Sequence, residues 1–345
     1  MDKKFLYDVL CTNGVSGNEL ELEKKFYDYM QDKADTVSVD ELGNVTACVN
    51  PDAGFKVLMA GHTDEIGLMV TAVGEDGMLK VTNIGGVYAT CFPGHKVRVH
   101  TKNGIIYGAV VNSRSIAKNK DLAAKDLRID IGATSKEDAL KYVSLGDTIN
   151  FDTDVRELLN GRITARAMDD RIGAFIVMSA VARAREKGAS IGVYGTSTTG
   201  EEIGGLGAYF TASRVKPNIA IAVDVTYTSD NAGIDTAVTG DIRVGEGPVI
   251  CNCPTVHKKV NSFLDKAAQN LNMKVQYEAA NGRTGTDGDT MTRTGIGVPF
   301  ALVSIPLRYM HSPDEVGSLQ DIDDCIELLA EFLCELTEDT NLKPF

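Results

Sequence analysis

Apolar residues near the N-terminus recur at the spacing of one helix face. The positions that share this spacing are Leu20, Leu22, Phe26 and Met30. Ser16 precedes them and Glu19 follows it by three residues, which is the arrangement of a capping box. The pattern therefore predicts an amphipathic helix that opens at Ser16.

Further along, short apolar runs alternate with helical patterns. Residues 37–50 alternate in polarity around a turn, which indicates two strands. Compact apolar runs at other positions are typical of buried strands: 56–60, 191–194, 218–223 and 298–305. Helical spacing marks Ile172, Phe175 and Ile176, and also the segment 319–336. This alternation predicts an α/β fold.

The pattern changes between residues 68 and 151, where short strands with frequent glycines replace the helices. The Asn103-Gly104 pair separates two β-rich runs and predicts a hairpin. Ser135 begins a short helix with capping-box spacing. We expect an inserted β-rich domain at 68–151 and a discontinuous main domain of 1–67 and 152–345. Two histidines of the insert, His95 and His100, are isolated, and we do not expect them to bind a metal.

Composition narrows the possible partners. The net charge is −13 over 345 residues, which argues against a nucleic-acid or anionic membrane partner. The first residues lack the apolar core of a signal peptide. The longest near-continuous apolar stretch, 172–182, falls short of the ~18 residues that span a bilayer. Seven scattered cysteines, including Cys251 and Cys253, do not resemble a disulfide framework. We therefore expect a cytoplasmic protein.

Two adjacent carboxylates follow the predicted strand at 191–194. Glu201 and Glu202 lie in a glycine-rich turn, where like charges repel and resist desolvation. A metal cation would relieve both costs by taking one carboxylate as a ligand, which leaves the other free to handle protons. The alternative is a solvated pair of glutamates in a surface loop.

Other potential ligands also stand at predicted strand ends: His62, Asp224 and His311. Sites of open α/β sheets lie at the carboxyl ends of the strands, so these side chains are expected to converge. Imidazoles and carboxylates together suit a pair of ions such as zinc or cobalt. Asp64, two residues after His62, is placed to accept its ring proton.

Asp169 and Asp170 precede the helical run that begins at Ile172. The helix dipole favours negative charge there. N-capping alone explains one of the two carboxylates.

Six motifs together resemble one enzyme family: Gly61-His62-Thr63-Asp64-Glu65-Ile66-Gly67, Ala167-Met168-Asp169-Asp170-Arg171, Gly200-Glu201-Glu202-Ile203-Gly204, Asp224-Val225-Thr226, Gly285-Thr286-Asp287 and Arg308-Tyr309-Met310-His311-Ser312. The chain resembles the cytosolic dinuclear metal aminopeptidases, which include glutamyl and deblocking aminopeptidases and the tetrahedral TET-type peptidases. The resemblance implies an α/β/α catalytic domain, an inserted β-rich dimerisation domain and often a tetrahedral dodecamer.

The resemblance also implies a role for each candidate residue. His62 and Asp224 would hold one metal ion, and Glu202 and His311 would hold the other. Asp169 would bridge the two ions, and Glu201 would act as the general base. Two divalent ions about 3.5 to 4 Å apart would acidify a shared water and polarise the scissile carbonyl. The implied reaction is hydrolysis of the N-terminal residue from short peptides.

Two departures from the family pattern are Thr63, where Met is more usual, and Gly288, where Ala is more usual. We expect both to affect the substrate pocket and not the metals. His257 has no ligand counterpart. Endoglucanase activity is an alternative, although the chain has no Trp with which to stack sugars. An inactive homologue that acts through its assembly is a third.

Overall fold

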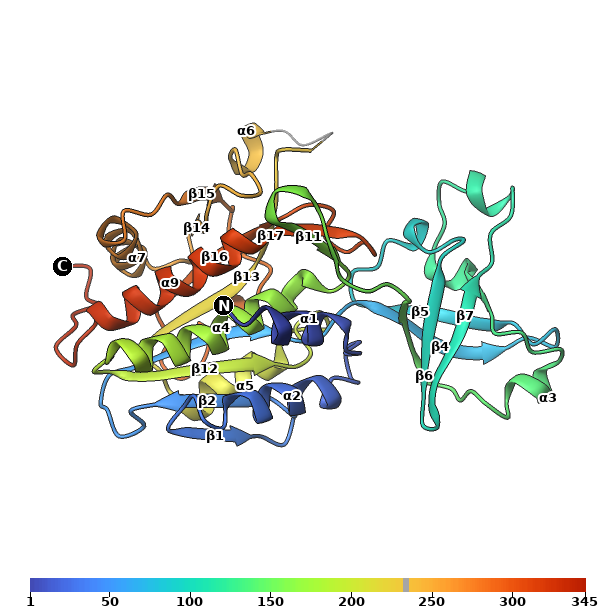
Figure 1. Cartoon of the computed structure of the whole chain (residues 1–345), viewed down its shortest axis with the longest axis horizontal. Coiled ribbons are helices and arrows are strands. Elements are labelled where there is room, and N and C mark those ends of the chain that lie inside the picture. The colour runs from blue at the N-terminus through green and yellow to red at the C-terminus, as the bar shows by residue number, and fades with distance from the viewer. Residues whose placement is uncertain (232–235) are drawn as a thin grey trace.

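An eight-stranded mixed sheet organises the larger part of the molecule (Figure 1). A computed structural model describes residues 1–231 and 236–345 of the chain. The strand order is β1-β2-β12-β3-β13-β16-β14-β15. The bounds are β1 Thr36–Val39, β2 Val45–Val49, β3 Lys56–His62, β12 Gly192–Thr198, β13 Ile219–Tyr227, β14 Val249–Asn252, β15 Gln276–Ala279 and β16 Phe300–Leu307. The four central strands, β12, β3, β13 and β16, run parallel, so their carboxyl ends share one edge.

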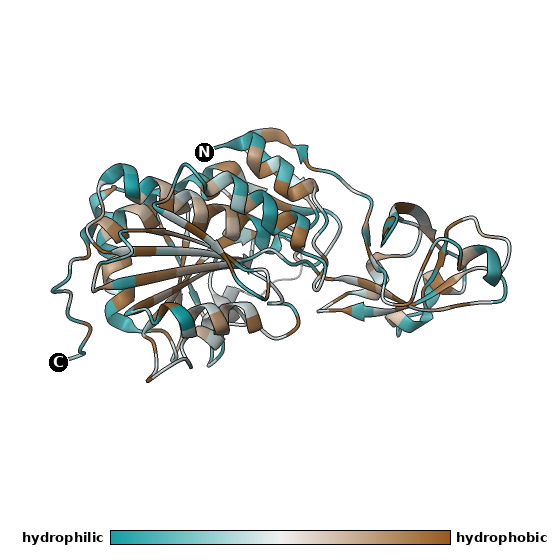
Figure 2. Cartoon of the chain, turned by 90° about the horizontal axis from the view of Figure 1, so that it is seen from below, coloured by the Kyte–Doolittle hydropathy of each residue, from teal (hydrophilic) through white to brown (hydrophobic). Residues whose placement is uncertain are grey.

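Helices cover both faces of this sheet, which confirms the α/β/α arrangement. α4 and α9 pack on one face, and α5 and α8 lie on the other. Figure 2 shows the largely hydrophobic strands enclosed between these layers, as expected for parallel strands buried on both faces. The bounds are α1 Lys3–Cys11, α2 Leu20–Met30, α4 Met168–Lys187, α5 Leu206–Val215, α6 Thr236–Thr239, α7 Lys258–Asn270, α8 Gly288–Met291 and α9 Leu319–Glu335.

A small closed barrel projects from one end of the sheet domain (Figure 1). Its strand order is β4-β5-β8-β7-β6-β9. It has its own apolar core, separate from that of the sheet domain. The bounds are β4 Gly67–Val73, β5 Leu79–Ile84, β6 Lys96–Thr101, β7 Gly104–Val110, β8 Arg128–Asp130, α3 Lys136–Ala139 and β9 Thr148–Phe151, with short 3₁₀ turns at Ala89–Cys91, Ile116–Lys118 and Ala124–Asp126. The hairpin predicted around Asn103 is β6–β7, with Thr101 paired to Gly104.

A three-stranded sheet joins the barrel to the sheet domain. Its order is β10-β11-β17, with bounds β10 Arg156–Glu157, β11 Arg162–Ala165 and β17 Glu315–Ser318, and a 3₁₀ turn at Leu159–Gly161 follows β10. The strands are antiparallel. β11 leads into α4, and β17 leads into α9. This sheet therefore brings the start of α4 next to the segment after β16.

The predicted capping box at Ser16 is wrong. α2 begins at Leu20, and its N-cap residue, Glu19, makes no capping hydrogen bond through its side chain. The Ser16 hydroxyl instead donates to Asp64 at 2.6 Å, and its amide donates to the Glu65 carbonyl at 3.2 Å. The segment around Ser16 thus pairs with the chain just after β3, and the Ser16 hydroxyl is not available to cap α2. Leu20, predicted on the buried face, is 72% exposed.

Other sequence features agree with the structure. The Ser135 hydroxyl accepts a hydrogen bond from the Asp138 amide and caps α3. Each of the seven cysteines lies in the described part of the chain, and none forms a disulfide. Among the described residues, no helix combines the length and the apolar character needed to cross a bilayer.

Candidate active site

Six side chains predicted from the sequence line one pocket at the carboxyl edge of the central strands. They are His62, Asp169, Glu201, Glu202, Asp224 and His311. The pocket has a volume of about 320 Å³. Parallel pairing places Thr198 beside His62, so the turn after β12 lies at the end of β3. Strand order therefore explains how ligand types far apart in sequence meet.

Close packing of β3 on α4 fixes one side of the pocket. A Cβ atom at Gly61 would lie 2.5 Å from main-chain atoms of Gly173 and Ala174. Because Gly61 has no side chain, the end of β3 approaches the first turn of α4 directly. His62 is thereby brought next to the aspartates of α4.

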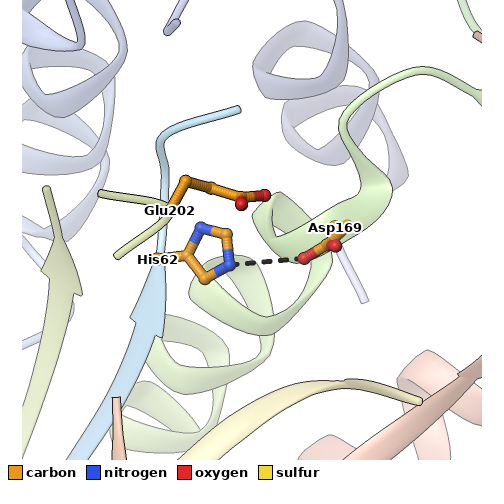
Figure 3. Close-up of side chains that lie close together, drawn as sticks. All are labelled: His62, Asp169 and Glu202. Carbon is orange, nitrogen blue, oxygen red and sulfur yellow. Dashed lines mark ion pairs between the residues drawn. The ribbon is translucent and has the colours of Figure 1, made fainter. Parts of the chain in front are cut away.

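Asp169 lies between the two histidines. Its Oδ1 is 3.3 Å from Nε2 of His62, and its Oδ2 is 3.1 Å from Nε2 of His311. Figure 3 shows Asp169 facing His62, with Glu202 above the imidazole ring. One carboxylate oxygen thus faces each ring.

The paired glutamates diverge toward different histidines. Oε1 of Glu202 is 3.3 Å from Nε2 of His311, and Oε2 of Glu201 is 3.9 Å from Nε2 of His62. Burial and the charge of Asp224 raise the pKa of Glu201 to about 10, although His62 opposes the shift. The two neighbouring carboxylates therefore occupy different parts of the pocket.

Asp64 anchors the glutamate turn from behind. Its carboxylate accepts hydrogen bonds from the amides of Glu201 at 3.0 Å and Glu202 at 3.2 Å, besides the Ser16 hydroxyl. Burial raises the pKa of Asp64, but contact with His62 and these donors lowers it overall. Nδ1 of His62 lies 3.0 Å from the Asp64 main-chain oxygen and 3.4 Å from its carboxylate. The main-chain carbonyl of Asp64 is therefore closer to Nδ1 of His62 than the Asp64 carboxylate is.

Asp170 is a site residue to which the sequence assigned no role of its own. Its carboxylate accepts hydrogen bonds from the amides of His62 and Gly173, each at 3.2 Å. Asp169 and Asp170 have non-helical φ and ψ angles at the start of α4, so the bond to Gly173 caps the regular turns that follow them, as anticipated for one of the two aspartates. Ligand atoms of His62, Asp170 and Asp224 also lie within 4.8 Å of one another, as do those of His62, Asp169 and Glu202.

Acidic side chains outnumber basic ones in this pocket. No Lys or Arg is among the described residues that line it. Burial lowers the pKa of His311, but contacts with Asp169 and Glu202 outweigh burial and raise it to about 11. Burial and the nearby aspartates raise the pKa of Asp224 well above its usual range. Without a cation the site accumulates protons, and its imidazole and carboxylate donors suit borderline divalent ions.

Glu315 is a residue of the site for which the sequence predicts no role. It is buried, and its carboxylate accepts hydrogen bonds from the main chain next to Asp169 and His311. No periodicity or spacing marks Glu315, because its position depends on the pairing of β17 with β11. Asp287, which belongs to the Gly285-Thr286-Asp287 motif, accepts a hydrogen bond from the Thr198 hydroxyl at the end of β12.

Neither departure from the family pattern lines the pocket, contrary to expectation. The Thr63 hydroxyl is buried and donates to the Glu23 carboxylate at 2.6 Å. Gly288 packs against Phe300, where a Cβ would lie 2.5 Å from the ring. Both residues therefore belong to the packing behind the site.

The histidines excluded as ligands also lie outside this pocket. His100 contacts Asn150 at 2.9 Å, and His95 packs edge-on against Phe151. The amide of His257 donates to the Phe300 carbonyl.

Comparisons with known proteins agree along most of the chain. The sequence profile of the M42 glutamyl aminopeptidase family matches residues 43–328. A putative aminopeptidase of Acetivibrio thermocellus is 36% identical over 346 residues, covering 97% of this chain and 100% of the relative. A lysyl aminopeptidase of Pyrococcus furiosus is 33% identical over 344 residues, covering 97% and 98%.

Solved structures of peptidases also align along nearly the whole chain. The TET aminopeptidase of Thaumarchaeota archaeon SCGC AB-539-E09 superimposes with a TM-score of 0.90 at 32% identity, covering 96% of each chain. The TET1 peptidase of Pyrococcus horikoshii, described as assembling into a tetrahedron or a large octahedral shell, has a TM-score of 0.85 at 27% identity over 96% of this chain and 99% of its own. A Thermotoga maritima structure titled endoglucanase has a TM-score of 0.76 at 28% identity over 96% of each chain.

The family match spans both the strand-end ligands and the glutamate turn, and the relatives align along nearly their whole length. The pocket contains the side chains that the family resemblance required. The chain therefore belongs to the M42 glutamyl aminopeptidase family and is an aminopeptidase.

Proposed function

We propose that the chain binds two divalent metal ions and removes N-terminal residues from short peptides. The observation that carries this proposal is the orientation of Asp169, whose two oxygens face the two histidine rings at 3.3 and 3.1 Å. A carboxylate in that orientation is suited to bridge two ions.

The remaining ligands divide into two groups around Asp169. His62 and Asp224 would hold one ion, and Glu202 and His311 the other. Zinc or cobalt fits these nitrogen and oxygen donors. When bound, such a pair supplies a Lewis acid that polarises the scissile carbonyl and acidifies water.

Glu201 is the proposed general base. It lies in the pocket, and its carboxylate is too far from His62 for a hydrogen bond. Bound cations would oppose the raised pKa of Glu201 and leave its carboxylate ionised, so that it could accept a proton. Glu201 would take the proton of the attacking water and deliver it to the leaving amine. The amide hydrogen bonds to Asp64 hold Glu201 and Glu202 in separate orientations during this transfer.

Metal removal tests this function. Chelation is expected to abolish hydrolysis of aminoacyl chromogenic substrates, and zinc, cobalt or manganese should restore it. A panel of substrates with different N-terminal residues would identify the preferred side chain. Full activity in demonstrably metal-free protein would contradict the proposal.

Glycoside hydrolysis is disfavoured by the same geometry. That reaction needs two carboxylates that flank the scissile bond. In this pocket Asp169 and Glu202 lie against imidazole nitrogens, as metal ligands do. An inactive homologue is also disfavoured, because the proposed base and all five proposed ligands line the pocket. Assaying a glucan beside the peptide panel distinguishes the three alternatives.

We also propose that the chain forms homo-oligomers through its barrel, as dimers that build a dodecamer. Ile105 and Tyr107 lie on the same face of β7 and are 50% and 64% exposed, which is unusual for apolar side chains at alternate positions. Light scattering at micromolar concentration should show an oligomer. Replacing both residues with Ser should reduce its size without loss of ion binding, whereas a monomeric wild-type chain would refute the proposal.

A further inference from the structure

Glu315 contacts the main chain of two separate ligand segments. Its Oε2 accepts hydrogen bonds from the amides of Met168 at 2.7 Å and Asp169 at 3.2 Å. Its Oε1 accepts a hydrogen bond from the amide of His311 at 2.9 Å. The side chain is buried, at 2% exposure, so these bonds are shielded from water. One carboxylate thus ties the segment of Asp169 to that of His311.

The topology explains why Glu315 occupies this position. β17 pairs with β11, with Glu315 opposite Ala165, and the chain continues from β11 to Asp169. Arg308 and Val316 exchange two main-chain hydrogen bonds of 3.0 Å, which close the loop that carries His311. Glu315 therefore stands where the two segments come together.

The loop of His311 needs such support. Tyr309 and His311 have φ values of 62° and 64°, in the left-handed region that residues other than glycine seldom adopt. A hydrogen bond to the amide of His311 stabilises this conformation. Because the bond comes from the residue that also binds the Asp169 amide, the separation of the two side chains depends on Glu315.

We propose that Glu315 is a positioning residue that holds Asp169 and His311 at the spacing needed for the ion between Glu202 and His311. This inference rests on the proposed pair of ions. Glu315 is not one of the proposed ion ligands, and among the described residues its carboxylate accepts hydrogen bonds from main-chain amides only.

Glu315→Gln tests the role with little change in volume. Glutamine offers one acceptor oxygen in place of two. That oxygen is expected to stay with the two amides of Met168 and Asp169, which leaves an NH₂ group facing the amide of His311. Loss of an outer partner of a metal ligand usually weakens binding about 10- to 100-fold. We therefore expect the affinity for one ion to fall by that factor while the affinity for the other is kept.

The affinities are measured by calorimetric titration of the metal-free protein with Zn²⁺. A second titration with Co²⁺ follows the absorption spectrum of the bound cobalt. Glu202→Gln removes a proposed ligand of the same ion and identifies which affinity is lost. Asp321→Asn is the matched control. Asp321 is fully buried and also accepts main-chain hydrogen bonds, from Gly245 at 2.7 Å and Gly247 at 2.9 Å, but it does not line the pocket.

The expected result is selective weakening in Glu315→Gln and two unchanged affinities in Asp321→Asn. If Glu315→Gln binds both ions with affinities within twofold of the wild type, the proposed role of Glu315 is overturned, but the proposed pair of ions is not. Equal weakening in Asp321→Asn would also overturn it, because general destabilisation would then suffice. A wild-type chain that binds fewer than two ions would overturn the proposed pair and this role with it.

Amide hydrogen exchange in the wild-type chain gives a second test that does not depend on the folding of a variant. Metal-free protein should show slow exchange at the amides of Met168, Asp169 and His311, because all three are bonded to a buried carboxylate. Rapid exchange of the His311 amide would contradict the proposal.

Discussion

Substituting glutamine for each of the paired glutamates separates the proposed base from the proposed ligand. Glu201→Gln preserves the shape of the side chain but removes its ability to accept a proton. Oε2 of Glu201 lies 3.9 Å from the nearest histidine nitrogen, so the substitution breaks no hydrogen bond to His62. The fold and the ion content should therefore remain those of the wild type.

The expected loss for Glu201→Gln is that of a general base. Such groups contribute ~10²- to 10⁴-fold in rate, which is about 3 to 5 kcal/mol of transition-state stabilisation. Glu202→Gln acts differently, since Oε1 of Glu202 is 3.3 Å from Nε2 of His311 at a proposed ion position. Replacing an anionic oxygen with a neutral amide should lower ion affinity first and turnover as a consequence.

The assay combines metal content by mass spectrometry with turnover at increasing Zn²⁺ or Co²⁺. Excess ion should partly rescue Glu202→Gln and leave Glu201→Gln unchanged. Loss of metal in Glu201→Gln, or nearly normal turnover in it, would show that the two roles are assigned the wrong way round.

Three further outcomes are expected. Gly61→Ala should lower the free energy of unfolding by about 1 to 3 kcal/mol and weaken ion binding, because its Cβ would lie 2.5 Å from the main chain of Gly173 and push β3 away from α4. Thermal unfolding and zinc titration check this prediction, and an unchanged Tm would contradict it. Asp64→Asn should lower turnover about 10- to 100-fold while the ions stay bound, since one oxygen cannot accept from all three donors that now bond to the carboxylate. The test is to measure kcat together with metal content, and loss of ions would point to a different role for Asp64. Burial raises the pKa of Asp321 to about 6 from an ordinary 3.8, against the effect of its amide hydrogen bonds. The folded chain therefore binds this proton more tightly than the unfolded chain, so the stabilisation is complete below about pH 4 and is lost as the pH rises through 6. The stability gap between wild type and Asp321→Asn should narrow by up to about 3 kcal/mol over that range, at about 1.4 kcal/mol per pKa unit, and a gap independent of pH in urea titrations would refute this.

The sequence by itself determined the architecture and most of the pocket. Its apolar runs predict the central strands, and the polar residues that end them predict the site, because parallel strands must place their carboxyl ends at one edge. The hairpin at Asn103 and the cap at Ser135 followed from turn and capping rules that depend on adjacent residues alone.

Tertiary structure decided which groups hold the site in place. Ser16 has the spacing of a helix cap, yet it donates to Asp64, because pairing beside β3 brings that buried carboxylate within 2.6 Å. Thr63 and Gly288 stand within or beside the motifs, yet they pack behind the pocket. Glu315 carries no signal at all, because every residue except proline offers the same amide donor. Which carboxylate accepts those amides depends on strand pairing between distant segments, and such pairing is settled only when the chain has folded.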